Sequence, residues 1–233
     1  NISCFSTCDG SASATIVGGT GPFSYLWSNG QTNPTASNFC AGPISVDVTD
    51  ANGCVVTAND VISEPSVLNS AIISSADVSC HSLCNGSASV NVSGGSPAYT
   101  YLWNDPMAQT NALANNLCAG NYIVDVTDAN GCTTSATITI NEPAPLQSSI
   151  TGVDVSCHNA CNGNADLTVF GGTPGYTFNW NDPNNSSSED ISALCAGTYA
   201  VTISDANGCI QTENITINQP SPLSLSASSI NSN

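Results

Sequence analysis

Short stretches of the chain alternate between apolar and polar residues, which is the pattern of strands with one buried face. Residues 87–93 read SASVNVS, and residues 121–127 place three apolar side chains on one face. Residues 99–103 form an aromatic-rich run, a composition that favours strands. Glycine pairs separate such stretches, and helical periodicity with capping residues is absent. The pattern predicts an all-β protein.

The same pattern occurs three times along the chain. Cys80 begins the segment CHSLCNGSASVNVSGG, and closely similar segments begin at Cys4 and Cys157. The tetrapeptide DANG also recurs three times, and three tryptophans keep the same spacing. Self-similarity at a fixed period indicates a tandem array of one structural unit.

These repeats divide the chain into consecutive domains. We expect repeat 1 at residues 1–64, repeat 2 at 65–142 and repeat 3 at 143–219, followed at 220–233 by a linker and the first strand of a further repeat. Repeat 1 should lack its first strand, so the chain reads as a slice of a longer array. Each full repeat should hold roughly seven turn-bounded strands, as in immunoglobulin-type sandwiches. The predicted fold is all-β: tandem immunoglobulin-like β-sandwich repeats arranged end to end.

The charge of the chain narrows its possible partners. It has 17 acidic residues and no Lys or Arg. Nucleic acid is excluded as a partner, because no basic side chain can replace the counterions around phosphates. Docking on an anionic membrane is excluded for the same reason. The chain has no apolar stretch of about 18 residues, so direct membrane insertion is not expected. Stability must come from burial, backbone hydrogen bonds and covalent links.

Each repeat contains four cysteines. An even number in small domains without charge pairs favours disulfides and an oxidising, extracytoplasmic location. A four-cysteine zinc site is the alternative, but the first two cysteines of each repeat are separated by three residues instead of two, and no second close pair follows. We therefore predict disulfides at Cys4, Cys8, Cys40, Cys54, Cys80, Cys84, Cys118, Cys132, Cys157, Cys161, Cys195 and Cys209.

The direction of the strands restricts how these cysteines pair. The close pair that opens each repeat should lie at the same end of the sandwich as Cys40, Cys118 or Cys195, and the DANGC cysteine at the other end. A strand of about six residues separates the ends by roughly 20 Å, beyond disulfide reach. One cysteine of each close pair should then bond within its own repeat. The two remaining cysteines could form a bridge between neighbouring repeats, which is a hypothesis.

The DANG segments allow two interpretations. Asp, Asn and a left-handed Gly predict a type I turn with a G1 bulge between two strands. The same oxygens could contribute to a calcium site, with neighbouring carboxylates at Asp47 and Asp125, although Thr202 replaces them in repeat 3. We favour the turn, because these oxygens cannot fill a calcium shell alone. The candidate calcium ligands are Asp47, Asp50, Asp125, Asp128 and Asp205, and no other cofactor is expected.

The histidines and tryptophans do not indicate catalysis. His81 and His158 follow the first cysteine of their repeats, but Phe5 takes this place in repeat 1, which favours loop surface or packing. No Ser/His/Asp arrangement or metalloprotease motif occurs, so the protein is not expected to be an enzyme. The tryptophans could stack on sugars, but their recurrent place in a strand favours core packing.

Together these motifs resemble the SprB repeat of Bacteroidetes cell-surface proteins. The resemblance rests on GGTGPFSYLWSNG, LCAGNYIVDVTDANGC and the Glu-Pro linkers, and covers nearly the whole chain. It implies a β-sandwich similar to polycystic-kidney-disease domains and a place in very large secreted adhesins, one of which resembles a mobile filament used in gliding motility. Ile44 stands where the usual residue is Tyr, which should alter a tyrosine-corner hydrogen bond. The resemblance implies no catalytic residues.

The expected function is that of a structural and adhesive array at a bacterial cell surface, forming an extracellular filament or stalk. Its expected partners are the neighbouring repeats of the same chain and other copies in a filament. A glycan- or host-protein-binding module, assisted by calcium, is the alternative. The strand expected at residues 223–229 could complete another copy. The absence of Lys and Arg also predicts resistance to trypsin-like proteases.

Overall fold

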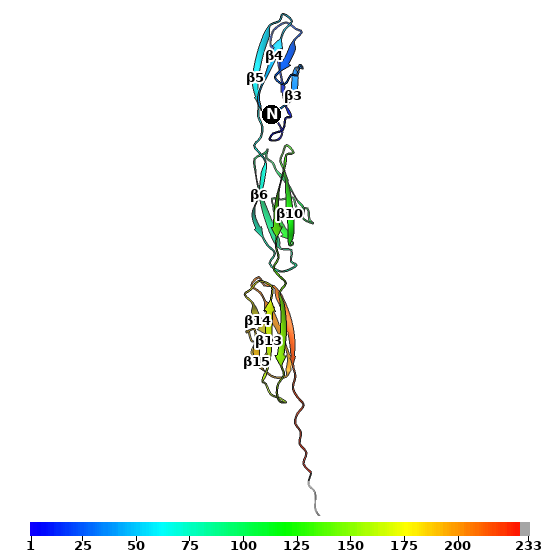
Figure 1. The fold of residues 1–233 in the computed structure, drawn as a ribbon, viewed down its shortest axis with the longest axis vertical. Coiled ribbons are helices and arrows are strands. Elements are labelled where there is room, and N and C mark those ends of the chain that lie inside the picture. The colour runs from blue at the N-terminus through cyan, green and yellow to red at the C-terminus, as the bar shows by residue number, and fades with distance from the viewer. Residues whose placement is uncertain (229–233) are drawn as a thin grey trace, which may run out of the picture. The chain divides into compact units, whose positions relative to one another are not determined.

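The computed structural model describes residues 1–228, which contain seventeen strands and no helix (Figure 1). No helix in this part of the chain is therefore long and apolar enough to cross a membrane. Repeat 1 contains β1 (Gly10–Ser13), β2 (Ser24–Trp27), β3 (Thr35–Phe39), β4 (Gly42–Thr49) and β5 (Val55–Ile62). Repeat 2 contains β6 (Asn69–Ala76), β7 (Gly86–Ser93), β8 (Thr100–Trp103), β9 (Leu113–Leu117), β10 (Gly120–Thr127) and β11 (Thr133–Ile140). Repeat 3 contains β12 (Gln147–Val153), β13 (Gly163–Phe170), β14 (Thr177–Trp180), β15 (Ile191–Leu194), β16 (Gly197–Ser204) and β17 (Ile210–Ile217).

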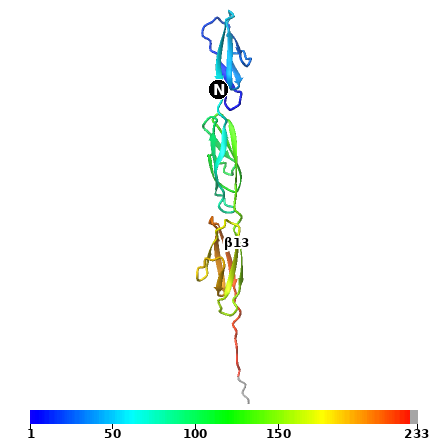
Figure 2. The same ribbon diagram turned by 60° about the vertical axis from the view of Figure 1, so that its left-hand side comes forward.

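Each full repeat is a sandwich of two three-stranded antiparallel sheets. In repeat 3 the orders are β12-β13-β15 and β14-β16-β17, and β13 runs through the middle of the first sheet (Figure 2). Repeat 2 has the equivalent orders β6-β7-β9 and β8-β10-β11. Repeat 1 has the sheet β2-β4-β5, but its other sheet contains only β1 and β3. The all-β, immunoglobulin-like prediction is confirmed.

The full repeats contain six strands, so the expected number of roughly seven was too high. Residues 104–112 of repeat 2 and 181–190 of repeat 3 connect two strands as loops. Each loop is held by a buried aspartate, Asp105 or Asp182, which accepts hydrogen bonds from loop N–H groups. The local hydrogen bonds replace the sheet pairing that a seventh strand would need.

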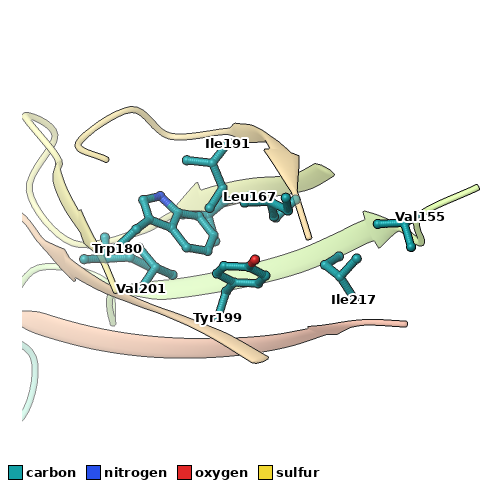
Figure 3. Packing of buried hydrophobic residues seen from close by; sticks show 10 residues of the cluster. Val155, Leu167, Trp180, Ile191, Tyr199, Val201 and Ile217 are labelled. Carbon is teal, nitrogen blue, oxygen red and sulfur yellow. The ribbon is translucent and has the colours of Figure 1, made fainter. Parts of the chain in front are cut away.

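The cores follow the alternation in the sequence. Tyr122, Val124 and Val126 on β10 are buried, as their spacing predicts. In repeat 3, Trp180 is only 1% exposed and packs among side chains from both sheets, including Leu167 and Val201 (Figure 3). Core packing of the tryptophans is therefore confirmed, and their rings are not available to stack on a sugar.

The chain divides into two compact units that do not follow the repeat boundaries. One unit consists of Asn1–Ala76 and Ser87–Ile140, and the other of Asp77–Gly86 and Asn141–Asn233. Residues 77–86 belong with the second unit because a disulfide joins Cys80 to Cys209 in repeat 3. The first cysteine loop of repeat 2 thus interacts with the repeat that follows it.

The segment after β17 differs from expectation. Residues 220–228 form no strand, and the side chains of Leu223 and Leu225 are fully exposed. The equivalent strands β6 and β12 form by pairing with β7 and β13, and no described strand pairs with residues 220–228. The remainder of the expected strand and linker, residues 229–233, lies outside the described residues.

Candidate functional site: the junctions between repeats

The DANGC turns are built by a single aspartate each. In repeat 2, Asp128 Oδ1 accepts hydrogen bonds from the backbone N–H groups of Asn130 and Cys132, both at 2.9 Å, and Oδ2 accepts one from Ser96 at 2.8 Å. Gly131 has a φ of 85° and donates its N–H to the Asp128 carbonyl. A positive φ at this turn position favours Gly over residues with a Cβ. The turn interpretation is confirmed, and Asp50 and Asp205 make the same bonds in their repeats.

These hydrogen bonds keep the turn aspartates ionised. The backbone N–H of Ser96 is the main cause that lowers the pKa of Asp128, and burial opposes it. For Asp205, burial acts to raise the pKa, but the backbone N–H groups of Thr173 and Cys209 outweigh it, so the pKa is lowered. Hydrogen bonds to a charged carboxylate favour the charged form.

Four of the five calcium candidates accept hydrogen bonds within their own repeats. The oxygens of Asp50, Asp128 and Asp205 already accept N–H donors from their own turns. Asp47 lies on β4 and accepts the Thr57 hydroxyl at 2.6 Å, and Asp125 is exposed on β10. Within residues 1–228 no group of three His, Cys, Asp or Glu side chains could hold a metal ion. The turn hydrogen bonds account for Asp50, Asp128 and Asp205, and a calcium site stays an alternative that these contacts do not require.

In repeats 1 and 3, one cysteine of the close pair bonds within its own repeat, as predicted. Cys8 pairs with Cys40, and Cys161 pairs with Cys195, with Cα–Cα distances of 3.9 and 3.8 Å. Cys84 and Cys118 are also disulfide-bonded. These bridges join the loop before β1 or β13 to the turn before β4 or β16.

The hypothesis of a bridge between repeats is also confirmed. Within the first unit, Cys4 of repeat 1 bonds to the DANGC cysteine of repeat 2, Cys132, at a Cα–Cα distance of 5.7 Å. Within the second unit, Cys80 of repeat 2 bonds to the DANGC cysteine of repeat 3, Cys209, at the same distance. The first cysteine of one repeat is therefore paired with the DANGC cysteine of the next.

An asparagine amide accompanies each bridge between repeats. Asn130 Nδ2 donates to the Ser3 carbonyl at 2.8 Å, and also to the Ser96 hydroxyl in its own repeat at 2.9 Å. In the second unit, Asn207 donates to the carbonyl of Ser79 at 2.9 Å and to the hydroxyl of Thr173 at 3.0 Å. In DANGC, the Asp thus shapes the turn, and the Asn side chain donates a hydrogen bond to the neighbouring repeat.

Two cysteines predicted to form disulfides are free. Cys54 and Cys157 are both exposed and unpaired in the described part of the chain. Cys54 is the DANGC cysteine of repeat 1, and Cys157 is the first cysteine of repeat 3. Because the pairing crosses from one repeat to the next, the partners that this pattern gives to Cys54 and Cys157 do not lie within residues 1–228, and the disulfides of these two cysteines stay a prediction.

The linkers and histidines hold the cysteine loops in place. Glu64 Oε2 accepts the N–H of Ser6 at 2.9 Å, and Glu142 Oε2 accepts that of Ser82 at 2.7 Å. His81 Nδ1 lies 3.3 Å from Glu142 Oε2, and His158 Nδ1 lies 3.2 Å from the Pro220 carbonyl. The histidines therefore contact the linker after their own repeat, which agrees with the loop role favoured from the sequence.

The buried Asp105 and Asp182 were not among the residues predicted from the sequence. Asp105 accepts from the Gln109 N–H at 2.9 Å, and Asp182 accepts from the Ser186 N–H at 2.7 Å. A signal was present, because each follows the strand tryptophan as Asn-Asp-Pro, a typical turn sequence. Repeat 1 has Asn29 after its tryptophan in a shorter loop.

The tyrosine corner occurs in the two full repeats. Tyr122 donates its hydroxyl to the Cys118 carbonyl, and Tyr199 donates to the Cys195 carbonyl, both at 3.0 Å. Ile44 is buried at the equivalent place in repeat 1 and has no hydroxyl to donate. The expected change in this hydrogen bond is confirmed.

Comparisons with known proteins identify one matching family and several similar structures. The SprB repeat family matches residues 1–32, 72–108 and 149–185. A search among curated proteins found no match. Among solved structures, the N-terminal eight Ig domains of Down Syndrome Cell Adhesion Molecule (DSCAM) are similar with 11% identity and a TM-score of 0.39, covering 84% of this chain and 32% of that one. Drosophila OTK extracellular domains 3-5 give 11% identity and a TM-score of 0.33, covering 93% of each chain. The chain thus spans about a third of the DSCAM fragment.

Proposed function

The chain carries SprB repeats at three positions, and from this premise we propose that it is a structural segment of an extracellular filament or stalk at a bacterial cell surface. Immunoglobulin-like domains with SprB repeats are typical of a surface adhesin, and several disulfides indicate an extracellular protein. The matched family is not a catalytic one. The observation that carries the proposal is the disulfide between successive repeats.

Two covalent connections link each pair of neighbouring repeats. One is the peptide linker, and the other is Cys4–Cys132 or Cys80–Cys209. A single flexible linker allows neighbouring domains to swing, whereas a second bond at a distance from the linker removes most of that freedom. The amide bond from Asn130 or Asn207 adds to the same contact. This arrangement suits an array that must keep its direction.

The same bridges limit extension under tension. A force applied ahead of Cys4 passes through the disulfide to Cys132, so it bypasses residues 5–79. From Cys132 the shortest covalent path to the end of repeat 3 runs back through residues 81–131 and crosses the Cys80–Cys209 bridge, so the chain can be drawn out by no more than the length of this segment. A filament that transmits force to a surface requires this property, whereas a module that only binds a ligand does not.

Single-molecule pulling tests the proposal. We expect the oxidised chain to release far less contour length than the reduced chain, and we expect the double variant Cys161→Ser/Cys195→Ser to behave like the oxidised chain because its bridges between repeats remain. Full extension of the oxidised chain would contradict the mechanical role. Immunogold labelling of intact cells of the source organism should place the protein on filaments outside the cell; labelling confined to the interior would contradict the location.

A further inference from the structure

The last strand of repeat 2, β11, forms a free edge of its sheet. Repeat 2 contains all six of its strands, so this edge belongs to a complete sandwich. The sheet order is β8-β10-β11, and β11 pairs with β10 along all eight of its residues. Within residues 1–228 no hydrogen bond reaches the other edge of this strand. An unpaired edge offers a row of N–H and C=O groups on which another strand can pair.

The turn before β11 determines which of its backbone groups face this free edge. The N–H of Asp128 donates to the Cys132 carbonyl at 2.9 Å, so these two residues form a hydrogen-bonded pair. In an antiparallel ladder such pairs alternate, so residues 134, 136, 138 and 140 bond to β10. On the other side of β10, the N–H of Asn104 bonds the Ile123 carbonyl, which agrees with this alternation. The N–H and C=O groups of residues 133, 135, 137 and 139 therefore point away from β10.

The sequence of β11 contains nothing that blocks this edge. Proteins protect long edge strands with charged side chains, prolines or bulges. β11 reads TTSATITI, residues 129–141 contain no acidic residue and no Pro, and the register with β10 is unbroken. Thr and Ile also favour strands. The adjacent edge strand of the other sheet, β6, is different, because a bulge between Ile72 and Ser74 interrupts its pairing with β7.

The equivalent edge of repeat 3 carries a charge. Glu213 of β17 takes the place of Ala136, because each is the fourth residue of an eight-residue strand. Glu213 Oε1 accepts the hydroxyl of Ser148 on β12 at 2.9 Å, so the carboxylate lies between the two neighbouring edge strands of that sandwich. A strand added to either edge would remove water from Glu213 without supplying a cation, which is unfavourable. Repeat 3 is therefore protected where repeat 2 is not.

The short edge strand β9, on the other side of repeat 2, is already occupied by a side chain. Gln109 Nε2 donates to the Asn115 carbonyl at 2.9 Å, and Gln109 Oε1 accepts the Asn115 N–H at 3.0 Å. Gln31 makes the same two bonds with Ser37 of β3 in repeat 1. In each case a side-chain amide takes the two hydrogen bonds that a neighbouring strand would take. Repeat 2 thus blocks the edge of β9 and leaves the edge of β11 open.

We propose that β11 pairs antiparallel with β11 of a second copy of this chain, and that Glu213 prevents the same pairing at β17. Two identical antiparallel strands are related by a two-fold axis, so both copies use the same surface. In the register that pairs all four outward-facing residues, Ser135 lies opposite Thr137 of the second copy, and Ala136 lies opposite Ala136. The net charge of −17 makes most surfaces of two copies repel, whereas β11 itself has no charge. This goes beyond the proposed function, because it joins separate chains side by side.

Reciprocal variants of β11 and β17 test the proposal. In sedimentation velocity we expect the chain to form dimers as its concentration rises, and hydrogen–deuterium exchange should slow in residues 133–140. Ala136→Glu copies the arrangement of Glu213, since Ser70 takes the place of Ser148. It should weaken the dimer about tenfold or more, because two carboxylates would meet at the two-fold axis. Glu213→Ala should give species larger than a dimer, because it opens a second edge.

A charge added elsewhere serves as the matched control. Thr202→Asp places a carboxylate on the central strand β16, as Asp125 does in repeat 2, and should leave the dimer unchanged. All variants carry Cys54→Ser and Cys157→Ser, so that thiol crosslinks do not contribute. A chain that stays monomeric, slowed exchange outside β11, or an equal effect of both added carboxylates would overturn the pairing of β11. A dimer that does not grow with Glu213→Ala would overturn the role of that glutamate.

A proline variant tests the backbone bonds without a change of charge. Thr137→Pro removes an N–H that faces the free edge and makes no bond to β10, a position where an edge strand tolerates Pro. It should abolish the dimer while circular dichroism keeps the signal of the folded chain. Thr137→Val keeps the N–H and should dimerise as before, and an equal effect of the two variants would overturn the proposal. Failure here is distinguishable from failure of the proposed mechanical role, because the pulling experiment measures single chains.

Discussion

Repeat 1 and repeat 3 share their cysteine, tryptophan and DANGC motifs but differ in how completely each core is covered. Repeat 3 has β12 beside β17, a tyrosine corner at Tyr199 and a loop held by the buried Asp182. Repeat 1 has none of these three features, and its β5 is exposed along most of its length. The comparison shows that the motifs are sufficient to place the sheets, whereas the strand contributed by the preceding linker closes the sandwich.

Truncation of the core tryptophan should have the largest effect. Trp180→Ala should destabilise repeat 3 by about 3–5 kcal/mol, because a fully buried ring leaves a cavity. Trp27→Ala should cost repeat 1 less, since Trp27 lines an open groove. Hydrogen–deuterium exchange read by peptides can report the two repeats separately. Equal costs would show that the groove is closed in solution.

Removal of the disulfide within a repeat should have the second-largest effect on stability. The double variant Cys161→Ser/Cys195→Ser should lower the free energy of unfolding of repeat 3 by about 2–4 kcal/mol, because the crosslink restricts the unfolded chain. The Cys8–Cys40 disulfide closes a loop of similar length in repeat 1, so Cys8→Ser/Cys40→Ser serves as the matched variant. Chemical denaturation of each would measure the difference. A clearly larger loss in repeat 1 would mean that its incomplete core depends more on the bridge.

The tyrosine corner should give a smaller effect. Tyr199→Phe removes the hydroxyl that bonds the Cys195 carbonyl and should cost about 1 kcal/mol. Tyr122→Phe should cost the same in repeat 2, since its bond has the same length. Thermal unfolding followed by circular dichroism measures both. If neither variant lost stability, the tyrosine corner would not contribute to a difference in stability between the full repeats and repeat 1.

Lowering the pH should produce the smallest effect on the free energy of unfolding, spread over several carboxylates. The N–H of Ser186 is the main cause that lowers the pKa of Asp182 below its ordinary value of 3.8. A carboxylate with a lowered folded-state pKa stabilises the fold above about pH 4, and this contribution is lost as the pH falls through the folded-state value. Repeat 3 should therefore lose stability below about pH 4, and Asp182→Asn, which copies Asn29 of repeat 1, should flatten this dependence. Unfolding curves from pH 7 to pH 2 would show it, and an unchanged slope in the variant would contradict the assignment.

Much of the candidate site was predictable because it depends on local chemistry. The left-handed glycine of DANG, the N–H bonds to its aspartate and the cysteine bonded within the repeat all follow from short-range geometry. Asp105 could have been found from the same reasoning, because Asn-Asp-Pro after a strand is a turn signal. The free state of Cys54 was not predicted, because it depends on which partner lies on each side of its repeat.

By itself, the sequence determined the strands, the repeat period and the turns, since alternation and turn residues act over a few positions. Only the tertiary structure decided which cysteines of different repeats meet, because Cys4 and Cys132 are 128 residues apart and their distance depends on how the sandwiches are joined. The same holds for burial: β5 and β17 are both eight-residue strands at equivalent positions, yet only β17 is half-covered. A strand buries its alternate face only when another strand lies against it, and that neighbour comes from a different part of the chain.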